Sequence, residues 1–293
     1  EVHWSEVPGR DEKWKAETIR NTSEQQFRTE FDCEFLGSVD TLINSAKLRV
    51  LSHNQPIQSN AGLDIYEMPQ KGHRYVITVD VARGTVNDYS AFVITDATQI
   101  PYKVVGKFRD NEIRPMLFPQ IIHKVATSYN TAEILVEVND IGGQVADTLQ
   151  FDLEYDNLIM VNQRGRSGQI AGTGFSGKQS QLGLRTTKAT KKIGCSNLKT
   201  MIETDKYLIH DFEIIQELST YILKGKEKYE AEEGSTDDLV TCLVMFAWLS
   251  NQTYFKELTD QDIRARLVDE QSHMMEQDMA PFGFVDNGID GPE

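Results

Sequence analysis

Short apolar segments rich in β-branched residues follow one another between residues 75 and 138. The runs at Tyr75–Asp80, Tyr89–Thr95 and Tyr102–Phe108 are separated by short polar turns, so we expect three strands in an antiparallel meander. A helical pattern with Pro115 in its first turn extends to about residue 129. A fourth apolar strand follows at Glu133–Val138, and IGGQVADTLQ begins the next helix.

The second half of the chain continues to alternate between strand and helix patterns. The segment Gln163–Gly183 is dense in Gly, Ser, Gln and Arg, which is typical of a mobile loop or hairpin. Around it we expect strands at NLIMVN and YLIH, and helices from about Ala189 to Glu203, from Phe212 to about Ile222, and from Thr236 onward. This order of elements predicts an α/β fold with a mixed sheet and helices on its faces.

The two ends of the chain look different from this central part. We expect an N-terminal extension at 1–70, with a helix at Asp11–Glu30 and a connector at Gln55–Gly72, a main domain at 71–255, and an acidic flexible tail at 256–293. The first residue is not methionine, which suggests a fragment or a processed chain.

Carboxylates stand at the ends of the predicted elements. Asp80 ends the first strand, Glu137 ends the fourth, and Asp237 and Asp238 open the last helix, while Asp88 opens the second strand. If the first and fourth strands are parallel neighbours, their ends lie together, and a helix packed on that edge can add its acids. Converging carboxylates repel one another, and a pair of bound divalent metal ions would neutralise this electrostatic repulsion. All-oxygen ligands favour Mg²⁺ or Mn²⁺ over zinc.

Each acid also has an ordinary structural interpretation. Asp237 could simply cap its helix, as could Ser235 or Thr236. Asp80 could initiate a turn through an Asx hydrogen bond. Glu137 fits this interpretation poorly, because turn chemistry favours Asp or Asn over Glu.

Charge is unevenly distributed along the 293 residues. The net charge of −15 argues against nucleic acid as a partner, yet the segment 163–199 contains no acidic residue. The basic residues there that we assign to DNA binding are Arg164, Arg166, Lys178, Arg185, Lys188, Lys191 and Lys192. We therefore expect a local polyanion site on an acidic protein. The longest apolar run is too short for a membrane span, and the three separated cysteines indicate reduced thiols.

One stretch, GTGFSGKQ at 172–179, is close to a phosphate-binding P-loop. The hydroxyl residue required at its eighth position is replaced by Gln179, and no apolar strand precedes it. We therefore expect no nucleotide site there, and interpret the stretch either as a loop along a DNA backbone or as a solvated surface loop.

The segments VITVDVARGTVNDYSAFVI, ILVEVNDIGGQVADTL and EGSTDDLVTCLVMFAWL together resemble the nuclease domain of tailed-phage large terminases, close to the T4-like group. The resemblance covers roughly residues 72–249, and residues 4–43 resemble the end of the terminase ATPase region. It implies an RNase H-like (RuvC/integrase-type) fold and an endonuclease that cuts concatemeric double-stranded DNA when packaging starts and ends.

The resemblance also assigns roles to residues. Asp80, Glu137 and one of Asp237 and Asp238 would bind two Mg²⁺ or Mn²⁺ ions, with Asp88 as an accessory acid. Expected partners are double-stranded DNA, the terminase ATPase region, the portal protein and the small terminase subunit, in the host cytoplasm on the viral prohead and with no membrane.

Two rival functions stay open on the sequence alone. One is another nuclease of the same fold, such as a junction resolvase or a transposase-like enzyme. The other is a non-catalytic domain that docks on a portal or an ATPase, with its acids serving only as caps and turns.

Overall fold

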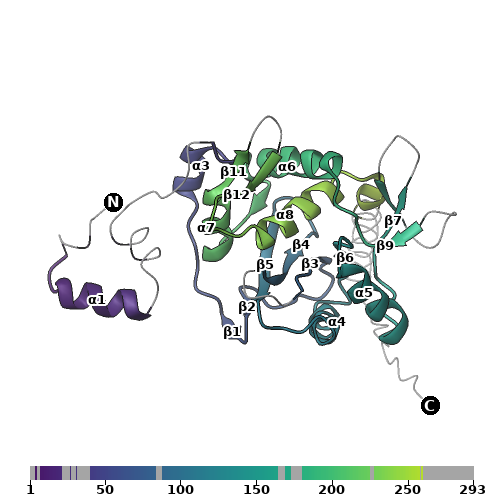
Figure 1. The fold of residues 1–293 in the computed structure, drawn as a ribbon, viewed down its shortest axis with the longest axis horizontal. Coiled ribbons are helices and arrows are strands. Elements are labelled where there is room, and N and C mark those ends of the chain that lie inside the picture. The colour runs from purple at the N-terminus through teal and green to yellow at the C-terminus, as the bar shows by residue number, and fades with distance from the viewer. Residues whose placement is uncertain are drawn as a thin grey trace, which may run out of the picture.

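The computed structural model of the chain describes residues 4, 7–21, 27, 31, 40–83, 88–163, 169–172, 180–224, 228–257 and 259. A mixed sheet forms its centre (Figure 1). Its strands, in spatial order, are β1 (Gln58–Asn60), β2 (Leu63–Ile65), β5 (Tyr102–Asp110), β4 (Ser90–Asp96), β3 (Tyr75–Asp80) and β6 (Glu133–Val136), with β10 (Tyr207–Leu208) also paired to β5. Strands β3, β4 and β5 are antiparallel neighbours, as the sequence predicts, and β6 joins β3 in parallel.

Most of the helices and two smaller sheets surround this central sheet, whereas α1 lies apart from it (Figure 1). The helices of the described residues are α1 (Glu12–Asn21), α3 (Ser45–Val50), α4 (Phe118–Ser128), α5 (Gly142–Asp147) with a π-helical turn at Thr148–Asp152, α6 (Lys188–Glu203), α7 (Phe212–Thr220) and α8 (Asp238–Leu249). The smaller sheets contain β7 (Met160–Gln163), β8 (Gln169–Gly172) and β9 (Ser180–Leu182), and β11 (Tyr221–Lys224) with β12 (Lys228–Ala231).

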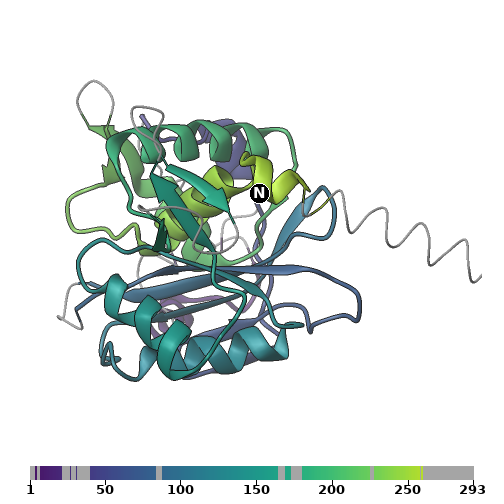
Figure 2. The same ribbon diagram turned by 90° about the vertical axis from the view of Figure 1, so that its right-hand side faces the viewer.

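Helices cover both faces of the central sheet (Figure 2). Side chains alternate along a strand, so Ile77 and Val79 of β3 face α4 and α5, while Val76 faces α8. Each face has its own buried apolar cluster, which explains why these strands read as continuous apolar runs. The predicted layered α/β architecture is confirmed.

Helix α8 has apolar residues on all sides, which suits its enclosed position in the fold. It packs on β3 and β4 below and against α6 and α7 above, and its residues from Cys242 to Leu249 are all buried. A helix of this composition belongs in the interior of a protein. Within the described ranges, no helix combines the length and the apolar character that crossing a membrane requires.

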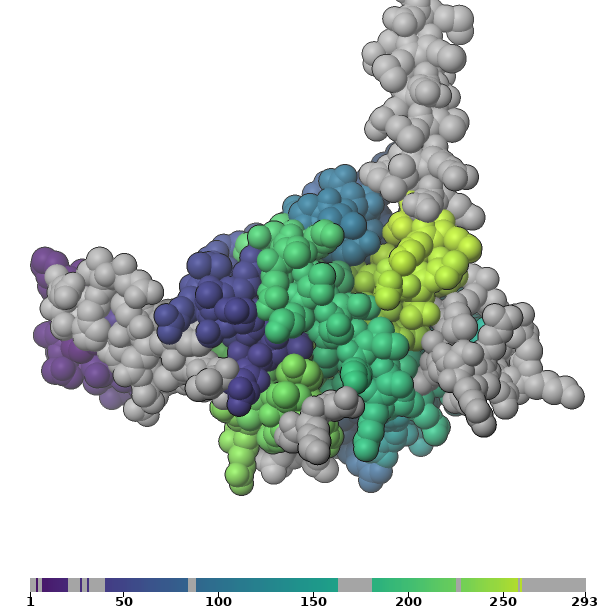
Figure 3. Space-filling model, turned by 90° about the horizontal axis from the view of Figure 1, so that it is seen from above, coloured from purple at the N-terminus to yellow at the C-terminus, as the bar shows by residue number. Residues whose placement is uncertain are grey.

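The region before β3, which includes the predicted connector at Gln55–Gly72, adds strands to the central sheet and side chains to its core. Residues 58–65 form the β1–β2 hairpin, and β2 pairs with residues 106–108 of β5. Leu42, Ile43 and Leu48 belong to the same buried cluster as α8. Figure 3 shows the dark blue segment after residue 40 beside the green surface of α6 and α7. The N–H of Leu42 in this segment donates to the carbonyl of Tyr221 at the start of β11. The domain limits at 70 and 255 stay predictions.

Several predicted boundaries were wrong. Helix α4 begins at Phe118, with Pro119 rather than Pro115 in its first turn. Pro115 lies in the turn before the helix, where its missing N–H is also harmless. The helix predicted to reach residue 222 ends at Thr220, because the chain then extends to form β11. The Gly-rich segment after 163, predicted to be a mobile loop or a hairpin, contains β8 and β9, which pair antiparallel with β7 on either side and agree with the hairpin alternative.

We predict that Gly194→Ala destabilises the fold by about 1–3 kcal/mol. A Cβ at Gly194 in α6 would lie 2.5 Å from the carbonyl oxygen of Val244 in α8, so the two helices would have to separate. The matched control is Gly143→Ala in α5, where a Cβ meets nothing within 4 Å and helix propensity favours alanine. Urea unfolding of both variants measures the difference, and equal effects would contradict the close-packing argument.

Candidate metal centre

The register of β3 and β6 places Asp80 and Glu137 side by side. Val79 pairs with Val136 in the parallel ladder, and the N–H of Glu137 donates to the carbonyl of Val79 at 2.8 Å. The next position on each strand carries the acid, so both carboxyl groups extend from the same end of the sheet. The expectation that these strand ends lie together is confirmed.

Two neighbours hold the Glu137 end of β6 in place. Asn139 donates through Nδ2 to Oε1 of Glu137 at 2.9 Å and to the carbonyl of Thr186 at 3.0 Å. Helix α5 starts directly behind, where a Cβ at Gly142 would lie 1.8 Å from the Glu137 carbonyl oxygen. Only glycine permits that approach. Sequence reasoning missed both residues, although the adjacent glycines of IGGQ were a signal for close backbone contact.

Helix α8 supplies the other two acids. Asp237 is the N-cap residue and Asp238 the first helical residue, but the Asp237 side chain accepts no hydrogen bond from the helix. Oδ2 of Asp238 is buried and has no hydrogen-bond partner among the described residues. The capping interpretation therefore does not account for this pair, and the Asx-turn interpretation of Asp80 has no hydrogen bond to support it in the described part of the chain.

The electrostatics show that these acids lie close to one another. Burial raises the pKa of Asp80 well above its usual range, and the carboxylates of Glu137, Asp238 and Asp237 raise it further. Burial also raises the pKa of Asp238 to about 7; Asp237 and Asp88 add to the effect, and the guanidinium of Arg109 opposes it. The cluster carries excess negative charge that only protons or cations can neutralise.

The residues present fit a divalent cation. The available donors are carboxylate oxygens, which Mg²⁺ and Mn²⁺ prefer, and the buried, unpartnered Oδ2 of Asp238 offers one of them directly. Across the described ranges, no three His, Cys, Asp or Glu side chains are gathered tightly enough to enclose an ion. Of the four acids, Asp237 has a cation as its neighbour: its Oδ2 lies 3.7 Å from Nζ of Lys191.

Asp88 lies at the rim of this cluster. It is exposed and precedes β4, close enough for its charge to raise the pKa of Asp238. On the same side, Arg83 and Asp140 form an exposed ion pair that joins the loops following β3 and β6. An exposed pair contributes little stability, but it links the two segments that follow Asp80 and Glu137.

The basic residues fall into two groups. Lys188, Lys191 and Lys192 occupy the first turns of α6, and Arg185 precedes them in an exposed position. The Lys191–Asp237 pair places this end of α6 beside the acids. Three further residues of the predicted set, Arg164, Arg166 and Lys178, lie outside the described residues, as does most of the segment that resembles a P-loop.

A sheet with parallel neighbours β3 and β6, carboxylates at their shared end and an acid-bearing helix across one face defines a protein of the RNase H-like class. The family model described as the terminase RNase H-like domain matches residues 77–250, and this chain belongs to that family.

Solved structures agree with this assignment of the fold. The chain is similar to the large terminase nuclease of the thermophilic phage G20c with bound magnesium, at 17% identity and a TM-score of 0.55, covering 72% of this chain and 97% of that one. The same nuclease with bound cobalt matches at 18% identity and a TM-score of 0.54, with the same coverage. The expected RNase H-like fold is confirmed.

The raised pKa of Asp238 predicts a pH-dependent stability of the metal-free protein. Asp238 binds its proton more tightly when folded, with a pKa of about 7, than when unfolded. Its contribution to stability is therefore fully present at low pH and is lost as pH rises toward about 7. We expect Asp238→Asn to melt higher than wild type at pH 8 in EDTA, with the difference shrinking at pH 4. Thermal unfolding at several pH values checks this, and a pH-independent difference would contradict it.

Proposed function

We propose that this domain is a metal-dependent endonuclease that cuts double-stranded DNA in a phage packaging motor, at the start and end of packaging. The observation that carries the proposal is the convergence of Asp80, Glu137 and Asp238, with a buried carboxylate oxygen left without a partner. Membership of the terminase RNase H-like family supports it. So do the related nuclease structures that contain magnesium or cobalt.

The roles follow from position. The negative charges of the other three acids all act on Asp80, which would hold both ions, while Glu137, oriented by Asn139, and Asp238 would each hold one of them. Asp237 would assist Asp238, and Asp88 at the rim would act as an accessory acid. Divalent ions bound there supply the activation of the attacking water and the stabilisation of the leaving oxygen in phosphodiester hydrolysis.

Helix α6 would hold the DNA backbone. Its first turns present Lys188 and Lys192 to solvent beside the acids, and basic residues that contact phosphates fix the position of a duplex without reading its sequence. Arg164, Arg166 and Lys178 would extend this contact along the segment after β7. We expect little sequence specificity from this arrangement.

The remaining expectations come from the terminase family. We propose that the domain works with a terminase ATPase region, the portal protein and the small terminase subunit, docked transiently on a prohead in the host cytoplasm. A purely docking role is less consistent with the structure, because Asp237 and Asp238 are not used as helix caps.

Plasmid cleavage tests the catalytic assignment. We expect wild type to nick and linearise DNA in Mg²⁺ or Mn²⁺, and Asp80→Asn, Glu137→Gln and Asp238→Asn to reduce the rate at least about 100-fold, because each removes charge that balances the metal ions. Asp237→Asn should reduce the cleavage rate less than these three substitutions. Circular dichroism controls for folding. Inactive wild type in both metals, or fully active Asp80→Asn, would refute the proposal.

The salt dependence of DNA binding tests the role of α6. In the Asp80→Asn background, which prevents cutting, Lys188→Ala should lower the slope of log K against log salt by about one. The control is Lys71→Ala, since Lys71 is exposed and precedes β3, and the strand spans about 17 Å from Tyr75 to Asp80 at its other end. Fluorescence anisotropy with a short duplex measures both, and identical slopes would place the duplex elsewhere.

A further inference from the structure

The first turn of α8 is capped in an unusual way. An N-cap side chain normally accepts the N–H of the second or third helical residue. Asn44 does so for Ala46 in α3, Thr187 for Thr190 in α6 and Asp211 for Ile214 in α7. In α8 the corresponding donor is the N–H of Val240. The Asp237 side chain does not accept it, and a residue from another helix does.

Glu217 of α7 takes that place. Its Oε2 accepts the Val240 N–H at 3.0 Å, and its Oε1 accepts the hydroxyl of Thr236 at 3.1 Å. The side chain is only 5% exposed. Both oxygens of one buried carboxyl group therefore bind residues that flank Asp237 and Asp238.

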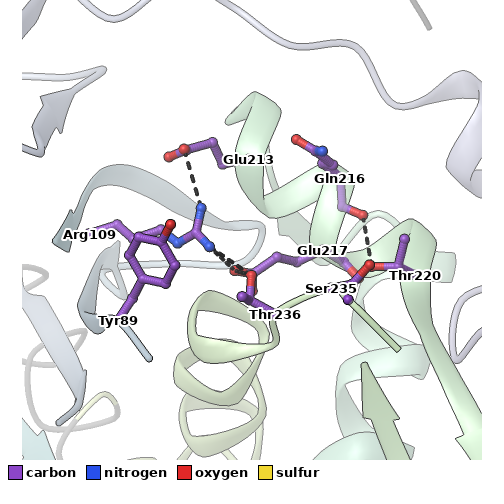
Figure 4. A pocket seen from close by; sticks show the side chains of 9 residues that line it. Tyr89, Arg109, Glu213, Gln216, Glu217, Thr220, Ser235 and Thr236 are labelled. Carbon is purple, nitrogen blue, oxygen red and sulfur yellow. Dashed lines mark hydrogen bonds and ion pairs between the residues drawn. The ribbon is translucent and has the colours of Figure 1, made fainter. Parts of the chain in front are cut away.

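Arg109 of β5 supports Glu217 from the other side. Its Nη2 donates to Oγ1 of Thr236 at 2.7 Å and lies 3.6 Å from Oε1 of Glu217, while the guanidinium stands 3.8 Å from the centre of the Tyr89 ring. These residues line a polar cavity of about 220 Å³ (Figure 4). Burial raises the pKa of Glu217 to about 8 against the opposing effect of Arg109, so a neutral glutamine is a close chemical substitute.

We infer that Glu217 is a positioning residue for the metal centre: by capping α8 in place of Asp237, it keeps both aspartates of the helix directed toward Asp80. This inference rests on the proposed function, because it concerns the use of those aspartates as metal ligands. Without Glu217, the Val240 N–H would compete for the Asp237 carboxylate, as it does at an ordinary helix start. Arg109 and Thr236 hold Glu217 in that position.

Calorimetric titration with Mn²⁺ alone tests the inference, together with melting temperatures in EDTA. Glu217→Ala removes the cap, and Glu217→Asp keeps a carboxyl group but is one methylene too short to reach both partners. We expect both to weaken Mn²⁺ binding by about 10- to 100-fold, the usual effect of losing a residue that orients metal ligands. Glu217→Gln should keep most of the affinity, because its amide oxygen can still accept from Val240.

Glu213→Ala is the matched control. Glu213 lies one helical turn earlier in α7, lines the same cavity and pairs with Arg109 and Lys107, but it makes no hydrogen bond to α8 among the described residues. We expect it to lower the melting temperature while leaving the Mn²⁺ affinity unchanged.

The outcomes separate this inference from the proposed function. If Glu217→Ala and Glu217→Asp melt lower but bind Mn²⁺ like wild type, Glu217 is only structural and the inference is overturned. In that case, loss of Mn²⁺ binding in Asp238→Asn would still support the metal centre. If wild type itself binds no Mn²⁺, both the inference and the proposed function are overturned.

Discussion

Repulsion between carboxylates held at one end of a sheet is the constraint on which the rest of this structure depends. The parallel register of β3 and β6 places Asp80 beside Glu137, and the start of α8 adds two more acids, Asp237 and Asp238. In water these groups would separate. Here the core on both faces of the sheet holds them together, so the free energy of apolar burial sustains an arrangement that is electrostatically unfavourable.

The surrounding cations compensate for that repulsion only in part. Arg109 opposes the rise in the pKa of Asp238 but does not cancel it, and Lys191 is 3.7 Å from only one of the acids. Stronger compensation, such as a bidentate arginine on Asp80, would remove the negative potential on which the proposed binding of a divalent ion rests. The incomplete balance is what suits the cluster to a metal ion.

Much of the fold followed from short-range patterns. The bounds of β3 and the meander were predictable because turns and β-branched runs are local signals, and the convergence of Asp80 with Glu137 followed once the strands were taken as parallel neighbours. The β1–β2 hairpin was missed because β1 is exposed and short, so it has no apolar alternation to detect. Arg109 and Glu217 could not be assigned either. Their contacts join β5, α7 and α8, which are distant in sequence, and nothing local marks a glutamate that caps a different helix.

The enclosure of α8 has a consequence for how the domain can be controlled. Segments that open readily are those with few buried contacts, whereas a deeply buried element opens at a cost that approaches the free energy of global unfolding. The part of α8 from Cys242 to Leu249 is of the second kind. The acids of α8 stand in its partly exposed first turn, so any local opening that withdraws them is confined to that turn while the buried rest of the helix stays in place. On the proposed function, restraint on cutting would act at this partly exposed end of α8, through what reaches the rim near Asp88 and α6.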